Sequence, residues 1–147
     1  MIQANELKIG NYVYDGNNIS FKVYSINKTF CHADGFTRKV SMKGISPIPL
    51  TEEILLKCEI AGMKVNKYPN VVVNEHEYYK RYAFYNIVDG TSNLEIHVIE
   101  SDYRYSKYKE FVLSIDNDER QHANISMLHK LQNAIYVATE LELEVNI

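Results

Sequence analysis

Hydrophobic and polar residues alternate along short segments in the first third of the chain. Over residues 19–26, Ile19, Phe21 and Val23 alternate with polar neighbours, which is typical of a strand with one buried face. Another strand is predicted over residues 7–14, with a bulge at its glycine. Two strands of this kind predict a β-rich start to the chain.

Turn signals separate these strands from further ones. Asp-Gly pairs occupy residues 15–16 and 34–35, and residues 28–33 and 36–42 predict two more strands. Several short strands within so few residues protect their edges best by curling into a barrel. We therefore expect an SH3-like small β-barrel over residues 1–49.

A helix is predicted to follow this module. Pro47 and Pro49 remove backbone donors that a strand needs, so the last strand ends before them. Thr51 is a suitable N-cap, and an apolar stripe continues to a stop at Gly62. The pattern predicts a linking helix of about ten residues within residues 50–62.

Strand patterns return over residues 63–115. In "LEIHVIE", Leu94, Ile96 and Val98 alternate with Glu95 and His97, so one face is expected to be buried and the other wet. The stretch "SDYRYSKYK" predicts an exposed loop or hairpin tip, and "DNDERQHAN" predicts a polar loop. With a C-terminal helix and a terminal strand, residues 63–147 are expected to form an antiparallel sheet packed by a helix, an α+β arrangement.

The C-terminal helix carries one polar stripe along the edge of its apolar face. At about 100° per residue, the stripe lies beside the side defined by Leu128, Leu131 and Ile135. Its members are His129, Gln132, Asn133 and Tyr136. Such a stripe can satisfy backbone groups of neighbouring loops, which we favour, or it can bind a small ligand or a peptide. Catalysis by His129 has less support, because no nucleophile or carboxylate stands beside it at helical spacing.

Tyrosine is the dominant aromatic residue, with 12 Tyr against 5 Phe and no Trp. Tyr103, Tyr105 and Tyr108 are interleaved with Arg104, Lys107 and Lys109. Aromatic and basic side chains together can stack bases and meet phosphates of a single strand. The alternative, which we favour, is that tyrosines pack a sheet while the basic residues solubilise its outer face.

Charge and cysteine content limit the classes of protein to which the chain can belong. The net charge is −3, but residues 1–49 hold six basic and three acidic residues, a net +3, which leaves −6 for the remainder. This excess is small for a protein that binds nucleic acid through phosphates. Cys31 and Cys58 are expected to be free, and no segment predicts export or membrane insertion, so we expect a cytoplasmic protein.

Catalytic and cofactor motifs are missing from the sequence. It has no glycine-rich phosphate loop, H-E-x-x-H, paired C-x-x-C or G-x-S-x-G, and no cofactor is expected. Asp116, Asp118, Glu119 and His122 share one predicted loop that can hold a divalent cation through oxygen ligands. The loop lacks the glycine and the later glutamate of a dedicated calcium loop, so a solvated turn is favoured.

Three blocks of the sequence resemble one family. They are "ANELKIGNYV" at 4–13, "IPLTEEILLK" at 48–57 and "LHKLQNAIYVATELEL" at 128–143. In this order they are similar to a family of small uncharacterised proteins encoded by phages and prophages of Bacteroidetes. The chain departs from the family pattern at "KCEIAGM" and at "TELEL", which lacks a glycine after the threonine. The resemblance implies a phage setting and no particular chemistry.

These observations favour a non-catalytic binding module. Its partner would be a host or phage protein, with inhibition of host defence as one form and sequestration of a small nucleotide as another. A homo-oligomer is compatible with the same sequence. The first alternative is a protein that binds single-stranded DNA or RNA. The second is an enzyme centred on His129 or on the 116–122 loop.

Overall fold

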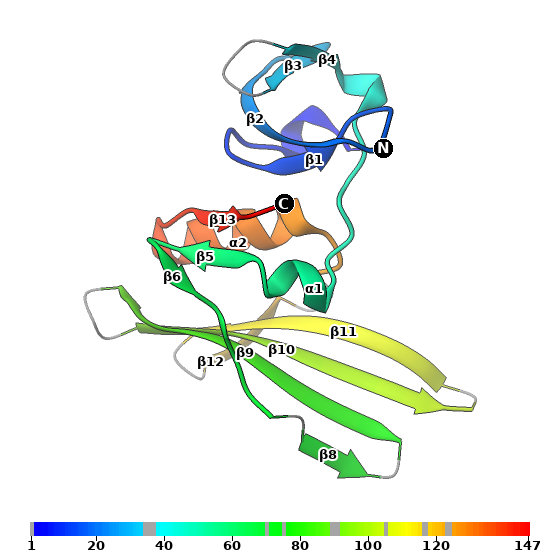
Figure 1. The fold of residues 1–147 in the computed structure, drawn as a ribbon, viewed down its shortest axis with the longest axis vertical. Helices are drawn as coiled ribbons and strands as arrows, with labels where there is room; N and C mark the ends of the chain where they lie inside the picture. The colour runs from blue at the N-terminus through cyan, green and yellow to red at the C-terminus, as the bar shows by residue number, and fades with distance from the viewer. Residues whose placement is uncertain are drawn as a thin grey trace. The chain divides into compact units, whose positions relative to one another are not determined.

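The computed structural model describes residues 2–33, 38–69, 71–74, 76–88, 92–104, 106–115, 118–122 and 125–147 (Figure 1). They divide into two compact units. The first, called the N-terminal unit, consists of residues 1–50, 127–142 and 147. The second, called the long-sheet unit, consists of residues 51–126 and 143–146.

The N-terminal unit is built on an antiparallel sheet. Its strands pair in chain order, β1 (Tyr12–Tyr14), β2 (Ser20–Ile26), β3 (Phe30–Ala33) and β4 (Arg38–Ser41). The 3-10 helices η1 (Ala4–Glu6) and η2 (Met42–Gly44) flank the sheet, and α2 (Leu128–Thr139) belongs to the same unit. The core contains the buried apolar side chains of Ile2, Leu7, Val13, Phe21, Val23, Cys31, Ala33, Met42 and Ile45.

The expected bulge is present before β1. The Gly10 N–H donates to the carbonyl of Val23, and the Val23 N–H donates to the carbonyl of Asn11, each at 2.8 Å. Gly10 and Asn11 therefore lie opposite the single residue Val23, as in a β-bulge. Gly10 adopts a φ of +95°, a conformation that suits glycine. Phe21 is buried as predicted, whereas Ile19 is exposed because it lies in the turn before β2.

A closed SH3-like barrel is not confirmed. Among the described residues, no strand pairing joins β1 to β4. Instead, Tyr14 and Ser46 exchange two backbone hydrogen bonds of 3.0 Å, which bring the segment after η2 to the free edge of β1. The predicted turn at residues 34–35 lies outside the described residues.

The long-sheet unit contains two antiparallel sheets and a short helix. The small sheet has the order β13-β5-β6, with β5 (Cys58–Ile60), β6 (Met63–Lys64) and β13 (Leu143–Val145). The long sheet has the order β12-β11-β10-β9-β7, and β8 also pairs with β9. Its strands are β7 (Asn66–Lys67), β8 (Val71–Asn74), β9 (Glu77–Val88), β10 (Ser92–Tyr103), β11 (Ser106–Ile115) and β12 (Asp118–His122), and the helix is α1 (Glu52–Leu55).

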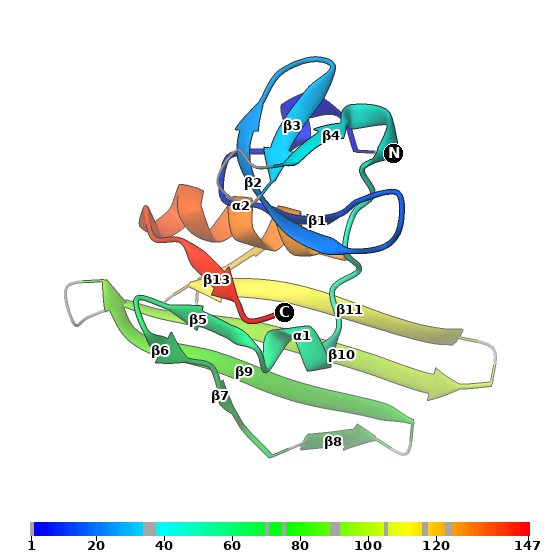
Figure 2. The ribbon, with the colours of Figure 1, turned by 45° about the horizontal axis from the view of Figure 1, so that its top comes forward.

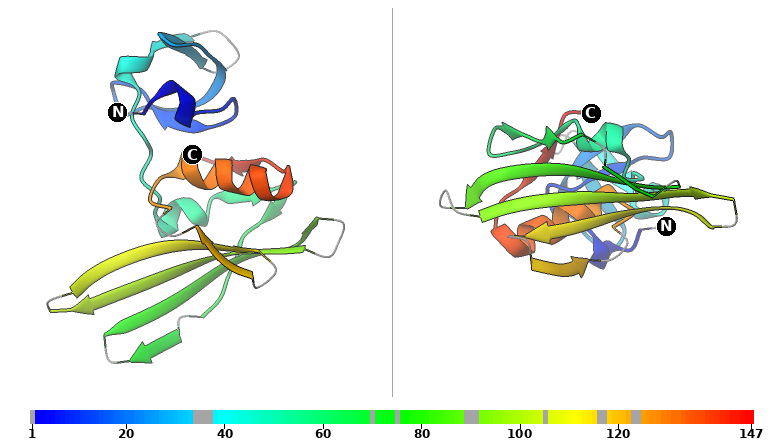
Figure 3. Two further views of the ribbon diagram at one scale, coloured as in Figure 1. Left: turned by 180° about the vertical axis from the view of Figure 1, so that it is seen from behind. Right: turned by 90° about the horizontal axis from the view of Figure 1, so that it is seen from below.

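The two faces of the long sheet differ. α1 and the small sheet lie on the same side of β9, β10 and β11 (Figures 1 and 2). We call this side the covered face, and Leu94, Ile96 and Val98 are buried on it as the alternation predicted. Seen from below, α1 and the small sheet lie behind β9, β10 and β11 (Figure 3, right). We call that side the open face.

The linking helix is much shorter than predicted. Thr51 caps it as expected, since its Oγ1 accepts a hydrogen bond from the Ile54 N–H at 3.2 Å. The helix ends at Leu55, and residues 58–60 form β5 instead. Here strand pairing overrides the helical pattern, because β5 has β13 on one side and β6 on the other. Gly62 therefore lies in the β5–β6 turn, with a positive φ like that of Ala61.

Two predicted loops also differ. The polar loop after residue 115 contains β12, which pairs with β11 through Leu113↔His122 and Ile115↔Asp118. An edge strand that pairs on one side tolerates such polar residues, which is why composition alone indicated a loop. The stretch 101–109 is a hairpin tip, but its strands run further than expected, to Tyr103 and from Ser106.

The grouping of α2 differs from the predicted ranges. Residues 63–147 were expected to form one module with the helix packed on its sheet, whereas residues 127–142 group with residues 1–50. The first residue of the helix illustrates this, since the Leu128 N–H donates a hydrogen bond to the Ile48 carbonyl at 2.9 Å. In the described residues the fold is sheet-rich and α+β, with antiparallel sheets and one main helix.

Glu52 connects α1 to the covered face. Its carboxylate accepts hydrogen bonds from Lys109 Nζ at 2.7 Å, from the Tyr82 hydroxyl at 2.7 Å and from Lys80 Nζ at 3.1 Å. Burial alone would raise the pKa of Glu52, but these three donors outweigh it and lower the pKa to about 2. The ionised carboxylate thus connects the helix to two strands of the long sheet.

We expect Glu52→Gln to lower the free energy of unfolding at pH 7 by about 2 kcal/mol, because the amide offers one uncharged acceptor oxygen where the two lysines and Tyr82 now share two charged ones. The carboxylate stabilises the fold above its unfolded pKa of 4.5, and this stabilisation is lost as the pH falls towards 2. Urea unfolding at a series of pH values should therefore show the wild type converging on the variant in this range.

The matched control is Glu53→Gln. Glu53 lies in the same helical turn with a largely exposed side chain that pairs with Lys57 at 3.5 Å. This substitution should change the free energy of unfolding by less than about 0.5 kcal/mol. Equal effects of the two substitutions would contradict the role given to Glu52.

Candidate functional site

Gln132, in the polar stripe of α2, binds backbone groups at the start of β1. Its side chain is fully buried. Oε1 accepts a hydrogen bond from the Tyr12 N–H at 2.9 Å, and Nε2 donates to the Gly10 carbonyl at 3.2 Å. The amide thus pairs backbone groups beside the bulge that would otherwise be buried unpaired. These contacts agree with the structural interpretation of the stripe, in which its side chains satisfy backbone groups of neighbouring loops.

Asn133 makes similar contacts one residue further along the helix. Its Nδ2 donates to the Glu6 carbonyl at 2.9 Å, and its Oδ1 accepts from Asn11 Nδ2 at 2.9 Å. Asn11 is itself buried, and its Oδ1 accepts from the Lys8 N–H at 2.8 Å. Asn133 therefore holds the turn that precedes β1.

Tyr136 is exposed and contacts a cation. Lys8 Nζ lies 3.9 Å from the centre of the Tyr136 ring. The same ammonium donates to both carboxylate oxygens of Glu142, at 3.0 and 2.9 Å. Tyr136 thus belongs to a surface cluster that joins the end of α2 to the first residues of the chain.

His129 is the exception in the stripe. Its side chain is buried, with 1% of the residue exposed, and neither ring nitrogen has a hydrogen-bond partner among the described residues. Burial lowers the pKa of His129, Glu6 opposes the shift, and Lys130 adds to it. No described nucleophile or carboxylate is hydrogen-bonded to the ring, so the geometry gives no support to catalysis by this histidine.

Gln132, Asn133 and Tyr136 therefore meet the segment that precedes β1. Periodicity predicted which side chains share the helix edge, but it contained no signal for their partners, which lie about 120 positions earlier in the chain.

The predicted tyrosine site lies on the β10–β11 hairpin. Tyr103 and Tyr108 are 49% and 40% exposed. Tyr103 pairs with Ser106, and Tyr108 pairs with Ser101, so both tyrosines point to the open face. The ring of His76 contacts Tyr103 edge-on, with 5.1 Å between centroids. Tyr105 lies outside the described residues.

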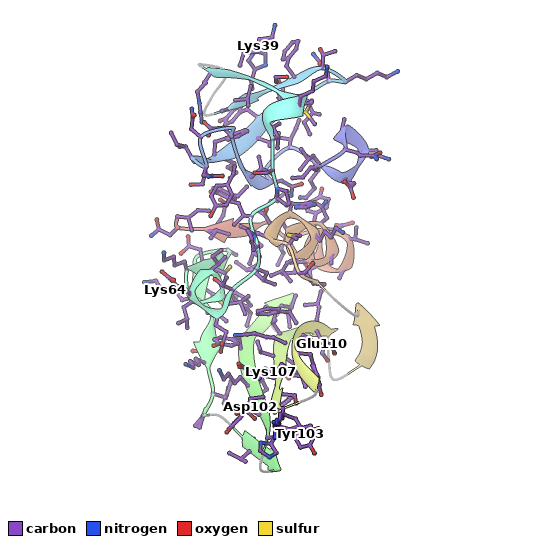
Figure 4. All side chains as sticks on the ribbon, turned by 90° about the vertical axis from the view of Figure 1, so that its right-hand side faces the viewer. Lys39, Lys64, Asp102, Tyr103, Lys107 and Glu110 are labelled. Atoms are coloured by element: carbon purple, nitrogen blue, oxygen red, sulfur yellow. The ribbon has the colours of Figure 1, made fainter. Side chains whose placement is uncertain are left out.

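The lysines of this hairpin point the other way. Lys107 pairs with Asp102, and Lys109 pairs with Glu100, which places both on the covered face. Lys109 is also bound to Glu52. Figure 4 labels Asp102, Tyr103, Lys107 and Glu110 along this hairpin. Alternation therefore separates the exposed tyrosine rings from the lysines that the sequence interleaves with them.

A chain of hydrogen bonds crosses the open face next to these tyrosines. His97 Nε2 lies 2.8 Å from Glu95 Oε2, and His97 Nδ1 lies 2.8 Å from the Tyr79 hydroxyl. Arg81 lies 3.7 Å from the other Glu95 oxygen and stacks over the ring of Tyr68 at 4.0 Å. The sequence pattern placed Glu95 and His97 on a wet face, but Glu95 is buried and His97 is half-buried. The pattern also gave no link to Tyr79, which comes from a different strand.

The proposed acidic loop is only partly described. Asp116 lies outside the described residues, while Asp118, Glu119 and His122 belong to the backbone of β12. Within the described part of the chain, no group of three or more His, Cys, Asp or Glu side chains is placed to hold a metal ion. The enzyme hypothesis that used this loop gains no support.

A groove of about 450 Å³ opens on the N-terminal unit. It is lined by Ile9, Gly10, Lys22, Val23, Tyr24 and Glu142. Ile9 and Tyr24 are exposed, and Lys22 and Glu142 add one charge of each sign. Its size falls within the range of small-molecule sites.

We expect Gln132→Leu to lower the free energy of unfolding by about 2 to 3 kcal/mol, because the buried Tyr12 N–H and Gly10 carbonyl lose their partners. Val137→Ala is the control, since Val137 is 84% exposed on the same helix and should cost less than about 0.5 kcal/mol. Urea unfolding followed by circular dichroism measures both. A cost for Gln132→Leu no larger than that of the control would contradict the role given to the amide.

We expect His129 to make the fold sensitive to mild acid. Since its pKa is lowered from 6.5 in the folded state, its contribution to stability is complete above pH 6.5 and is lost as the pH falls below it. The slope can reach about 1.4 kcal/mol per pH unit.

Thermal unfolding between pH 7 and pH 5 tests this expectation. His129→Leu should flatten the profile, whereas Val137→Ala, at an exposed position of the same helix, should leave its slope unchanged. A profile in His129→Leu as steep as that of the wild type would show that another group is responsible.

Comparison of the chain with protein-family models, with curated proteins and with solved structures returns no match. The resemblance to phage and prophage proteins therefore stays a prediction. In the part of the chain that the structure describes, none of the helices has the length and apolar character needed to cross a membrane.

Proposed function

We propose that the chain is a non-catalytic protein-binding module whose docking surface is the open face of the long sheet. The observation that carries the proposal is the difference between the two faces of β9, β10 and β11. The covered face buries its large apolar side chains, while the open face leaves aromatic and aliphatic side chains in reach of a partner. On the open face these are Tyr79, Ile99, Tyr103, Tyr108 and Val112.

The chemistry of these side chains suits a protein partner. Tyrosine combines a large apolar ring with a hydroxyl that hydrogen-bonds, and it is enriched at protein interfaces for this reason. Tyr103 and Tyr108 are large exposed rings on adjacent strands, and β11, which carries Tyr108, is held from behind by the contact between Lys109 and Glu52. A rigid support reduces the entropy lost on binding.

The charges of the open face favour a protein over a nucleic acid. Glu77, Glu95 and Glu110 face the same side as the tyrosines, against one cationic side chain on the described parts of the paired strands, that of Arg81. Carboxylates repel phosphates, and the lysines that would attract them lie on the covered face. Binding of single-stranded DNA or RNA stays the alternative prediction, with less support than a protein partner.

The sequence resemblance suggests where such a partner would be found. A phage or prophage protein of Bacteroidetes would meet host proteins in the cytoplasm, and an inhibitor of host defence is one form of the proposal. We further propose that the N-terminal sheet is an SH3-like barrel, with the Tyr14–Ser46 bridge as its support. The groove beside Tyr24 is the place for a small nucleotide if the module also binds one.

The proposal predicts that the open-face tyrosines determine partner binding. In pull-downs from a Bacteroidetes lysate, Tyr103→Ala with Tyr108→Ala should remove a band that the wild type retains. Loss of two central interface tyrosines is expected to weaken binding by about 2 kcal/mol or more, roughly 30-fold in the dissociation constant. Titration of the identified partner then measures this change directly.

The matched control is Lys107→Ala, which changes an exposed residue of the same hairpin on the covered face. It should retain the partner. Circular dichroism melting checks that all variants stay folded. A partner that binds the double tyrosine variant as tightly as the wild type would overturn the open face as docking surface, and retention of single-stranded DNA with no protein partner would favour the alternative.

A further inference from the structure

His97 lies between a carboxylate and a phenol on the open face. Because a carboxylate only accepts hydrogen bonds, His97 donates from Nε2 to Glu95 Oε2, at 2.8 Å. This contact places the lone pair of the neutral ring on Nδ1, where the Tyr79 hydroxyl donates to it at 2.8 Å. Glu95 thus sets the tautomer that makes His97 a base towards Tyr79.

The arrangement has the parts that an activated nucleophile needs. A hydroxyl is a weak nucleophile at neutral pH because it stays protonated, and a base within hydrogen-bond reach relieves this. The base in turn must be oriented by a third group, which Glu95 supplies here. The three residues stand on two adjacent strands, where Tyr79 pairs with Ile99 and His97 pairs with Arg81.

The orienting carboxylate is itself held. Only 10% of the Glu95 side chain is exposed, and Arg81 lies 3.7 Å from its second oxygen. Arg81 is kept in place by the ring of Tyr68. The charge on Glu95 is therefore balanced by a fixed guanidinium, which leaves the first oxygen for His97.

Tyr79, in contrast, is less buried than Glu95. Tyr79 is half-buried on the open face, on the side of β9, β10 and β11 away from α1 and the small sheet (Figure 3, right). Tyr103 and Tyr108 lie on the same face and are more exposed. They serve as references on the same face for the reactivity of Tyr79.

We propose that Tyr79 is a nucleophilic acceptor site for acyl groups from activated carboxylic esters, with His97 as its base and Glu95 as a positioning residue. In the reaction the Tyr79 oxygen forms a bond to the acyl carbon while its proton moves to His97 Nδ1. The bond between the acyl carbon and the leaving oxygen then breaks. The leaving group takes the proton from the imidazolium, so His97 is regenerated and Tyr79 carries an aryl ester.

This inference goes beyond the proposed function. It rests on the Glu95–His97–Tyr79 contacts and needs no protein partner, whereas the docking proposal rests on Tyr103 and Tyr108. Its failure would leave protein binding by the open face untouched.

The test uses the intact protein and p-nitrophenyl acetate. Acetylation of each tyrosine is followed over time by peptide mass mapping at neutral pH. Tyr79 should react on the order of 100-fold faster than Tyr103 and Tyr108, as general-base assistance predicts. All three tyrosines are measured in the same wild-type protein, so the comparison does not depend on whether any variant folds.

Variants then assign the roles. His97→Gln should bring the rate at Tyr79 down to that of the two reference tyrosines. Glu95→Gln should lower the rate and shift its pH profile, and Glu95→Asp should restore part of it, which a merely structural role would not do. Tyr103→Phe is the matched control and should leave Tyr79 reactive.

Two results would overturn the inference. If Tyr79 in the wild type reacts no faster than Tyr103 and Tyr108, it is not an activated nucleophile. If His97→Gln stays folded and Tyr79 keeps its rate, the imidazole is not the base.

Discussion

The alternation of side chains along β9, β10 and β11 is the constraint on which the rest of the structure depends. Successive residues of a strand face opposite sides, so a strand that buries Leu94, Ile96 and Val98 must present Glu95 and His97 to the other side. Since β10 pairs with β9 and with β11 along most of its length, the side chains of all three strands are divided between the same two faces. One face becomes a core surface, and the other becomes a polar and aromatic surface.

The functional surfaces follow from this division. The covered face places the Lys80, Tyr82 and Lys109 head groups where the Glu52 carboxylate binds them, which joins α1 to the sheet. The open face collects residues that are distant in the sequence, including Tyr79 from β9 and His97 from β10. A base and a phenol meet there because neighbouring strands bring diagonal positions within contact distance. The same geometry moves the lysines of the hairpin away from the tyrosines and so weakens the case for nucleic acid.

The polar edge of α2 hydrogen-bonds to the segment before β1. The turn before β1 leaves backbone donors and acceptors beside the helix, and burying them unpaired would be costly. Gln132 and Asn133 pair with them, so these contacts agree with the structural role predicted for the two residues. His129 lies in the same stripe, and neither of its ring nitrogens has a hydrogen-bond partner among the described residues; its lowered pKa reflects its burial.

The sequence by itself determined the local features whose causes lie within a few residues. Alternation identified the buried side of β10, Thr51 was recognisable as a helix cap, and 3.6-residue periodicity placed Gln132 and Asn133 on one helix edge. Only the tertiary structure decided which distant segments meet. Residues 58–60 became a strand because β13 and β6 pair with them, α2 joined the N-terminal unit, and Tyr79 came into contact with His97. The physical reason is that propensity and periodicity act over one or two turns or strands, whereas pairing partners are selected by the burial and hydrogen bonding of the whole chain.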